Sequence, residues 1–382
     1  MSKYELSISA DYVSSWGVVE GAREFFQNAL DEQTEDPDNT MFHEYDSSEQ
    51  ILRVGNKSST LDIQTLLFGN SSKSNNPSMI GKFGEGYKIA TIVFLRNGKE
   101  VTFYNYCSKE IWHTKLVKSR RYKGALVPTF YVDKVSFWEK VPENSLIIEI
   151  KGITSEEYEL IKESNLWLQG IYDSGSEADY YTTGYGKILL DDKYKGKLFV
   201  SGLYVCSNSK LEYGYDVTPN QIRLDRDRGL VSDIDLAFLT SKMWTSYRDS
   251  ENASRREEFK EDFLAVVDTF DGSYTNYYTS SEDQNAVVTE FFEKNGTSAV
   301  PVSNQDEAER AAKLSLKPIY VTENKKKIIT ESKEYKTNGN AIVTKTLYQR
   351  LVEFSEAVDD RLTDEERTEI ADIIQKSRWL LS

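Results

Sequence analysis

Three side chains that could bind a metal ion or activate water recur at helical spacing near the N-terminus: Glu24, Asn28 and Asp31. On a helix of about 100° per residue, with Glu24 at 0°, Asn28 lies at about 40° and Asp31 at about −20°. Their oxygens therefore form one narrow column, while Phe26 and Ala29 lie on the opposite, apolar face. A solvated surface is the simpler explanation of such a column, although solvated helix faces usually mix both signs of charge.

A later glycine-rich stretch, residues 81–88, could bind phosphate. Gly81, Gly84 and Gly86 leave the backbone able to approach a ligand closely. The apolar run 89–95 predicts a buried helix, whose N-terminus would direct free N–H groups at an anion. The stretch is not a Walker A loop, because Gly-Lys-Ser/Thr is absent at the required spacing. It also lacks the preceding strand and the later acidic residue of a dinucleotide-binding site.

Together the two stretches resemble the characteristic boxes of the GHKL ATPases, which include gyrase B, a heat-shock chaperone, MutL-type and MORC proteins and histidine kinases. The first matches the box Glu-x-x-x-Asn-x-x-Asp/Ala. The second, IGKFGEGYK at residues 80–88, matches the glycine box and is most similar to MORC-like and stand-alone bacterial or phage members. The resemblance implies an α+β fold, a Bergerat-type sandwich that binds ATP and Mg²⁺.

The resemblance also implies roles for the residues of both boxes. Glu24 would be the general base that activates water, and Asn28 would bind Mg²⁺ through its amide oxygen. Asp31 would support the water shell of the ion or the position of the helix. The phosphates would be bound by the glycine box: Gly81, Lys82, Phe83, Gly84, Glu85, Gly86, Tyr87 and Lys88.

The adenine site matches the family imperfectly. Where the family has Asp-x-Gly-x-Gly, this chain has Asn56 and Ser58. An amide oxygen can accept the hydrogen bond of the adenine amine, but it is neutral and therefore a weaker acceptor than a carboxylate. Where the family has Gly-Thr, Asn144 and Ser145 keep a hydroxyl and lose the glycine. Because of these differences, the sequence leaves open whether the site selects adenine and whether it hydrolyses ATP.

Two further loops are expected near the phosphates. The polar loop before the glycine box would form a lid with Ser71, Ser72 and Lys73, unless it is a plain surface loop. Residues 196–229 resemble the transducer domain of the gyrase, MutL and MORC branch, in which a basic residue reaches the γ-phosphate. Arg223, Arg226 and Arg228 are the candidates here, and a structural ion-pair network explains them equally well.

The order of patterns predicts three domains. Residues 1–155 would bind ATP, with strands at 51–54, 101–106, 111–116 and 145–150 in an antiparallel sheet covered by helices on one side. A helix from Ser155, its expected N-cap, to about Leu168 opens the transducer-like α/β domain, residues 156–250. Residues 251–382 would form an α/β and helical region. It would contain a strand–helix–strand unit at 299–321, whose helix starts with a Ser303–Asp306 capping box, and a last helix that starts with a Thr363–Glu366 capping box.

Composition limits the classes of function. The chain has 382 residues, two cysteines and no apolar run of about 20 residues, so we expect a cytoplasmic protein without disulfides. His43 and His113 are too far apart to suggest a metal pair. The net charge of −15 makes general nucleic-acid binding unexpected and leaves a local basic patch open, and the lack of a long apolar run makes a membrane role unexpected.

We therefore expect a Mg-dependent, slowly turning-over ATPase that acts as a nucleotide-gated switch and dimerises when ATP binds. In dimeric relatives an N-terminal arm crosses to the partner. Residues 1–16 would be that arm, or an edge strand of their own sheet. The rivals are a kinase of the same fold, a non-hydrolysing nucleotide-binding scaffold, and a phage or bacterial conflict protein that binds an unknown partner through residues 250–382.

Overall fold

The computed structural model describes residues 1–66, 86–135, 143–222, 231–247, 253–337 and 347–377. The chain divides into two compact units. The first consists of Met1–Tyr180, Leu189–Asn208 and Gly214–Val231, and the second of Tyr181–Ile188, Ser209–Tyr213 and Ser232–Ser382. The three domains expected from the sequence remain predictions.

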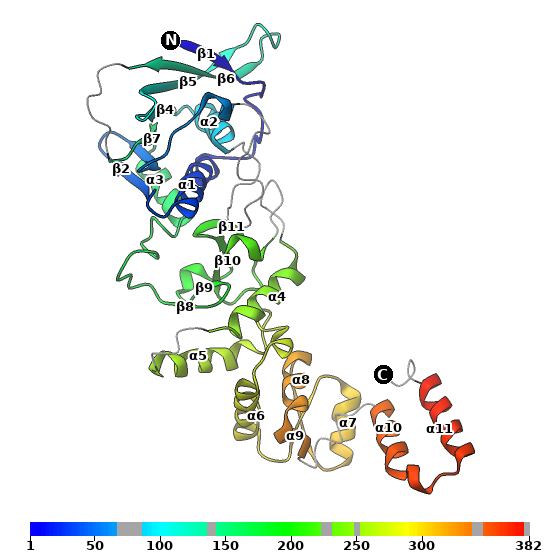
Figure 1. Cartoon of the computed structure of the whole chain (residues 1–382). Coiled ribbons are helices and arrows are strands. Elements are labelled where there is room, and N and C mark those ends of the chain that lie inside the picture. Colours follow the sequence, from blue (N-terminus) through cyan, green and yellow to red (C-terminus); the bar gives the residue numbers. More distant parts are fainter. Residues whose placement is uncertain (67–85, 136–142, 223–230, 248–252, 338–346, 378–382) are drawn as a thin grey trace. The chain divides into compact units, whose positions relative to one another are not determined.

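The first unit is built on a seven-stranded sheet of order β1-β6-β5-β4-β7-β3-β2 (Figure 1). Every neighbouring pair in it is antiparallel, which confirms the predicted α+β class. The N-terminal strand pairs with β6 of its own sheet and lies at the edge. The strands are β1 Ser2–Glu5, β2 Met41–Asp46, β3 Ile51–Asn56, β4 Glu100–Asn105, β5 Glu110–Lys118, β6 Leu126–Lys134 and β7 Leu146–Lys151.

The described residues of this unit include three helices, α1 Val18–Glu35, α2 Gly86–Arg96 and α3 Ser155–Glu163, with the 3₁₀ turn η1 Ile63–Leu66 before α2. The apolar face of α1 is buried, and the Phe25 ring stacks on Phe94 of α2 and meets Phe103 of β4 edge-on. Alternating residues of β7, among them Ile148, complete the core.

Helix α3 differs from the prediction at both ends. Its N-cap is Thr154, not Ser155, because Thr154 and Glu157 form a reciprocal capping box. The helix ends at Glu163, and Trp167 beyond it instead donates its indole N–H to the carbonyl of Ser201 at 3.0 Å.

Arg96, the last residue of α2, fixes the segment that precedes α1. Its guanidinium donates to four backbone carbonyls, those of Ala10, Tyr12, Val13 and Trp16, at 2.7–3.1 Å. Val13 has a positive φ of 47°, an uncommon conformation for a β-branched residue. The Arg96 bonds therefore hold a strained loop in one conformation.

The remainder of the first unit contains β10 Lys197–Val200, β11 Leu203–Ser207 and β12 Gly214–Val217, with short 3₁₀ turns η2 Asp192–Tyr194 and η3 Pro219–Gln221. β10 and β11 form an antiparallel hairpin, and β12 pairs with β10 in parallel. Buried Asp216 holds this region together, because it accepts hydrogen bonds from the Tyr172 hydroxyl and from the Gly202 N–H.

The second unit is mainly helical. The predicted strand–helix–strand is present: β13 and β14 pair in parallel and α7 connects them. Its N-cap is Asn304, not Ser303, because Asn304 Oδ1 accepts from the Glu307 N–H while Glu307 Oε2 accepts from the Ser303 N–H. The elements are β8 Tyr180–Thr182, β9 Gly186–Leu189, α4 Asp233–Trp244, α5 Ala253–Val266, η4 Thr275–Tyr277, α6 Ser281–Asn295, β13 Ala299–Val302, α7 Gln305–Lys313, β14 Lys317–Tyr320, α8 Glu323–Glu331, α9 Lys333–Thr337, α10 Leu347–Val358, η6 Asp359–Arg361 and α11 Asp364–Ser377.

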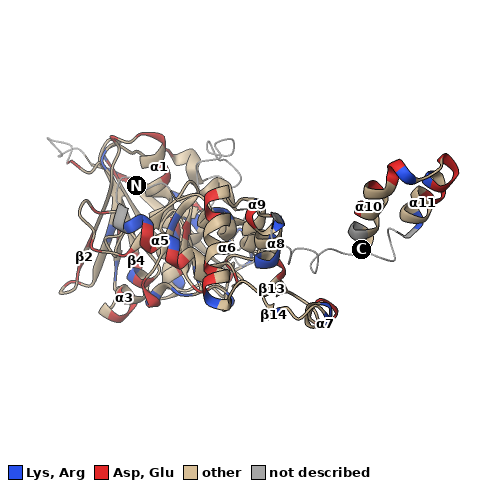
Figure 2. Cartoon of the chain, turned by 90° about the horizontal axis from the view of Figure 1, so that it is seen from below, with Lys and Arg blue, Asp and Glu red and all other residues tan. Residues whose placement is uncertain are grey.

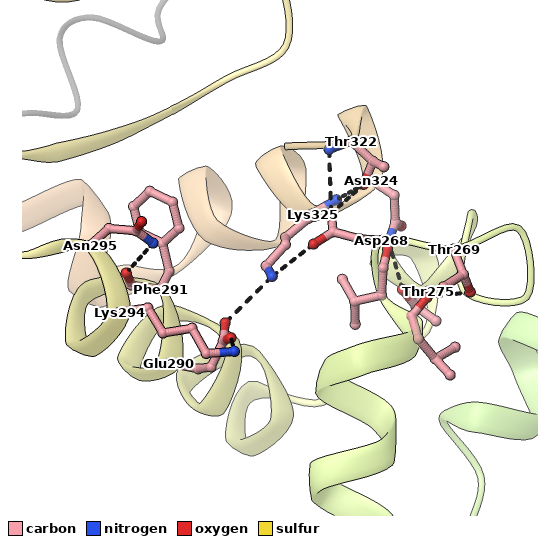
Figure 3. Close-up of polar contacts among 12 residues, drawn as sticks. Asp268, Thr269, Thr275, Glu290, Phe291, Lys294, Asn295, Thr322, Asn324 and Lys325 are labelled. Atoms are coloured by element: carbon pink, nitrogen blue, oxygen red, sulfur yellow. Dashed lines mark hydrogen bonds and ion pairs between the residues drawn. The ribbon is translucent and has the colours of Figure 1, made fainter. Parts of the chain in front are cut away.

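Helix α8 is fixed by polar contacts of two neighbouring residues (Figure 3). Lys325 Nζ lies between Asp268 Oδ2 at 2.8 Å and Glu290 Oε2 at 3.4 Å. The buried Asn324 amide donates to the Val267 carbonyl and the Thr275 hydroxyl. These contacts bind α8 to α6 and to the segment after α5.

The last helix, α11, is acidic, with five Asp and Glu against one Arg and one Lys. Figure 2 shows the ribbon coloured red for Asp and Glu at several places where α10 leads into α11, which starts with Asp364, Glu365 and Glu366. The Thr363–Glu366 capping box predicted for α11 is present. Within the described ranges, no helix combines the length and the apolar character that crossing a membrane requires.

Candidate active site

The start of α2 lies directly against the polar column of α1. A Cβ built on Gly86, the first residue of α2, would lie 2.8 Å from Asn28 Nδ2 and 3.1 Å from Glu24 Oε2. Only glycine fits here without displacing a side chain. Two stretches far apart in the sequence thus meet at Glu24 and Asn28, whose side chains could activate water and bind a metal ion.

The column is not a solvated surface. Glu24 is 4% exposed and Asp31 1% exposed, whereas Asn28 is half-buried. Buried carboxylates are uncommon unless they have partners or a function. Glu24 Oε1 lies 3.6 Å from Nη2 of Arg23, whose guanidinium lies over the Trp16 ring at 5.0 Å from its centroid.

Asn28 is oriented so that its oxygen remains available. Its Nδ2 donates to the Glu24 carbonyl at 2.7 Å, one turn back along α1. No residue in the described ranges donates to Asn28 Oδ1. An amide oxygen held in this way fits a hard cation such as Mg²⁺, which takes one or two protein oxygens and completes its shell with water and phosphate oxygens. No cluster of three His, Cys, Asp or Glu side chains suited to a metal occurs among the residues described.

The two residues after Gly86 are also shielded from solvent, Tyr87 partly and Lys88 fully. Burial, together with the neighbouring carboxylates of Glu32 and Asp31, raises the pKa of the Tyr87 phenol, so this group stays neutral. Lys88 is 1% exposed and its Nζ donates to the Thr65 carbonyl at 2.7 Å. Lys88 thus joins α2 to η1, and its expected contribution to phosphate binding remains a prediction.

The end of β3 positions a second amide. Asn56 is 1% exposed, and its Nδ2 donates to the Ala29 carbonyl of α1 at 2.9 Å and to the Asn39 carbonyl at 3.1 Å. Both amide hydrogens are used, which fixes which end of the amide is oxygen. Asn56 Oδ1 accepts no hydrogen bond from the residues that the structure describes.

The backbone around Asn56 is held by hydroxyl and amide groups. Ser145 donates its N–H to the Asn56 carbonyl and its hydroxyl to the Ser59 carbonyl, both at 3.0 Å. The Ser58 N–H donates to Asn39 Oδ1 at 2.7 Å. Ser58 and Ser145, both expected near the base site, therefore lie beside Asn56.

Sequence reasoning missed two residues of this site. Asn39 binds the backbone of the β3 loop, and no local pattern marked it. Gly55 lies where a Cβ would be 1.9 Å from the Leu146 carbonyl, so β3 and β7 could not approach this closely with any other residue. The Gly-Asn pair at the end of a predicted strand was the available signal for Gly55.

The other predicted site residues lie outside the described ranges. They are Ser71, Ser72, Lys73, Gly81, Lys82, Phe83, Gly84 and Glu85 of the loop before α2, and Arg223, Arg226 and Arg228.

Comparisons with known proteins give likenesses of structure only. No family model matches the sequence, and no curated protein matches it. The ATPase region of Saccharomyces cerevisiae topoisomerase II is similar at 11% identity and a TM-score of 0.33 when bound to dexrazoxane, and at 12% and 0.32 in a second structure. Each alignment covers 49% of this chain and 62% of that one. The ATPase and transducer domains of DNA topoisomerase II from Balamuthia mandrillaris are similar at 13% identity and 0.31, over 49% and 60%. This chain thus spans less than two thirds of each of those chains.

Proposed function

We propose that residues 1–155 bind ATP with Mg²⁺ and hydrolyse it slowly, and that the nucleotide acts as a conformational switch. The proposal rests on the close approach of Gly86 to Asn28 and Glu24. This contact brings the start of α2 next to the polar side chains of α1. A helix N-terminus that begins with glycine leaves room for a phosphate to approach its N–H groups, and the adjacent Glu24 carboxylate can activate an attacking water.

Glu24 acts as the general base. Its carboxylate orients the water, accepts one of its protons as the water oxygen attacks the γ-phosphorus, and so contributes a factor of about 10²–10⁴ in rate. ADP and phosphate are the products. Asp31 supports the same face of α1 from a buried position.

Asn28 Oδ1 would hold the Mg²⁺ ion. When bound, the ion supplies positive charge that offsets the phosphate oxygens. Asn28 suits this role because its amide nitrogen is already bonded to its own helix. The loop Ser71–Lys73 would cover the phosphates, and one of Arg223, Arg226 and Arg228 would contact the γ-phosphate.

Asn56 selects the base. The fixed Oδ1 accepts a hydrogen bond from an exocyclic amine, which adenine has at the position where guanine has a carbonyl. ATP binding would favour a closed, dimeric form over an open form. Residues 156–250 would transmit that change and residues 251–382 would bind a partner, in a setting of phage–host conflict.

The experiment that tests the proposal is phosphate release by Glu24→Gln beside Glu35→Gln. Glu35 lies exposed near the end of the same helix and controls for loss of one charge from α1. We expect Glu24→Gln to retain ATP binding and lose at least about 100-fold in turnover, while Glu35→Gln stays within twofold of wild type. Equal turnover in both variants would show that Glu24 is not the base.

One observation favours a non-hydrolysing nucleotide-binding scaffold as the second candidate. The Arg23 guanidinium, 3.6 Å from Glu24, competes for the carboxylate that would accept the proton of water. A scaffold binds ATP and releases no phosphate, so the same assay on the wild-type protein separates the two functions.

A further inference from the structure

The β5–β6 hairpin is strongly basic in an acidic chain. Residues 111–132 contain no Asp or Glu, whereas the whole chain has 62 of them against 47 Lys and Arg. The hairpin carries five cationic side chains, all of them exposed: Lys115, Lys118, Arg120, Arg121 and Lys123. We call these five residues the basic hairpin patch.

The cations of the patch lack carboxylate partners. None of the five forms an ion pair with any residue that the structure describes, in contrast to Arg53, which binds Glu44 and Glu149. Arg121 instead lies over the ring of its neighbour Tyr122, with the guanidinium carbon 5.4 Å from the centroid. Exposed charges without partners remain available to a ligand.

The nearest carboxylate already has partners of its own. Glu5 of β1 accepts hydrogen bonds from Lys3 at 2.7 Å and from Ser119 at 2.6 Å. These two bonds, assisted by the nearby charge of Arg121, hold the pKa of Glu5 below its ordinary value. Asp133, farther along β6, lies 3.5 Å from the N-terminal amine. Neither group neutralises the patch.

The hairpin tip is a defined structure. The Ser119 N–H donates to the Ala125 carbonyl at 2.9 Å, and the Gly124 N–H returns a bond to the Ser119 carbonyl at 2.8 Å. Gly124 has a φ of 88° and Lys123 one of 52°, which turns the chain within the tip. Ser119 is fully buried and ties the tip to β1 through Glu5. The cations are therefore presented on a fixed ribbon beside β1 (Figure 1).

We propose that the basic hairpin patch binds the phosphodiester backbone of a nucleic acid. A stable protein interface is built around an apolar centre, and lasting attachment to an anionic membrane adds inserted apolar side chains to the electrostatic attraction. In residues 115–126 the only large apolar side chain counted as exposed is Leu126. Closely spaced Lys and Arg without interleaved acids fit a row of phosphates instead.

The chemistry of the patch determines how it binds. The contacts are to phosphates, so binding is independent of sequence and weakens as salt rises. The remaining negative charge of the chain is screened beyond roughly 8 Å at physiological ionic strength, so it does not cancel the local attraction. Tyr122 adds a ring on which an unpaired base can stack.

The test is fluorescence anisotropy of the full-length protein with a 30-bp DNA duplex and with a single strand of the same length, at 50–200 mM salt. If all five cations contact phosphates, the slope of log K against log salt is about −4.5 for the duplex and about −3.5 for the single strand. Binding that does not change with salt would overturn the proposal. So would binding to polyglutamate or phosphatidylserine vesicles with none to either DNA.

The variant Arg120→Glu/Arg121→Glu should lose at least tenfold in affinity and show a shallower salt slope. The matched control is Lys162→Glu/Lys193→Glu, which changes the net charge equally at two cations of the same unit that belong to ion pairs, Lys162 half-buried and Lys193 exposed. The control should bind within threefold of wild type. Equal affinity of the two variants would refute the proposal. Thermal unfolding checks the fold, and Lys118→Gln/Lys123→Gln replaces the first variant if that one is unfolded.

Discussion

Gly86 and Asn28 lie so close that no side chain fits between them: a Cβ on Gly86 would come within 2.8 Å of Asn28 Nδ2. The residues are far apart in the chain, and they join the start of one helix to the polar face of another. The proposed function depends on this contact.

Gly86→Ala should therefore reduce ATP turnover at least tenfold without unfolding the protein. The added methyl displaces the Asn28 amide and the Glu24 carboxylate, while alanine is a better helix former than glycine by about 1 kcal/mol. Steady-state phosphate release measures the effect. Gly17→Ala is the control, since a Cβ there meets only Glu20 Oε2 at an ordinary 3.5 Å. Wild-type turnover in Gly86→Ala would show that the contact between Gly86 and Asn28 does not contribute to catalysis.

Asn28→Ala should remove the Mg²⁺-dependent part of ATP binding. Titration calorimetry with and without Mg²⁺ should then give Kd values within twofold of each other, because the ion has lost its protein ligand. Asn97→Ala is a close control: Asn97 Nδ2 also donates to a carbonyl one turn back, that of Val93, at 2.7 Å. A Mg²⁺ effect of wild-type size in Asn28→Ala would place the ligand elsewhere.

Wild-type protein should bind ATP at least tenfold more tightly than GTP, and Asn56→Ala should bring the two affinities together. The reason is that Asn56 Oδ1 can accept from adenine and would face an oxygen of guanine. Competition against a fluorescent ATP analogue measures both affinities. Equal wild-type affinities for the two nucleotides would contradict the assignment.

Asn324→Ala should destabilise the second unit by about 2–3 kcal/mol. The buried amide makes three hydrogen bonds, to the Val267 carbonyl, the Thr275 hydroxyl and the Asn276 N–H, and its removal leaves buried partners unpaired. Urea unfolding followed by tryptophan fluorescence measures the loss. Asn295→Ala, which loses one bond at 2.9 Å to the Phe291 carbonyl, should cost less than about 1 kcal/mol. Equal losses of unfolding free energy in the two variants would show that the three bonds of Asn324 stabilise the unit no more than the one bond of Asn295.

Periodicity and composition predicted much of the fold, because its helices and strands follow local patterns. The column of α1 could be placed from residue spacing alone, and so could the strand–helix–strand of the second unit. The caps of α3 and α7 were wrong by one residue. At each, two adjacent polar residues could serve, and the hydrogen bonds to Glu157 and Glu307 decided between them.

The missed parts depend on contacts between distant segments. Nothing local marks Asn39 as the residue that holds the β3 loop, because its partners, Ser58 and Ser59, follow only after the two strands β2 and β3. The same holds for the parallel pairing of β12 with β10, because β11 lies between these two strands in the chain. Long-range pairing of this kind leaves no periodic signature.

The four hydrogen bonds that Arg96 donates to backbone carbonyls make α2 a connection between the candidate active site and the segment before α1. A helix of eleven residues is a stiff rod of about 16 Å. One end of this rod abuts Glu24 and Asn28, and the other is clamped to the loop that leads from β1 into α1. A displacement of α2 at its Gly86 end would therefore also shift the segment between β1 and α1 at its other end.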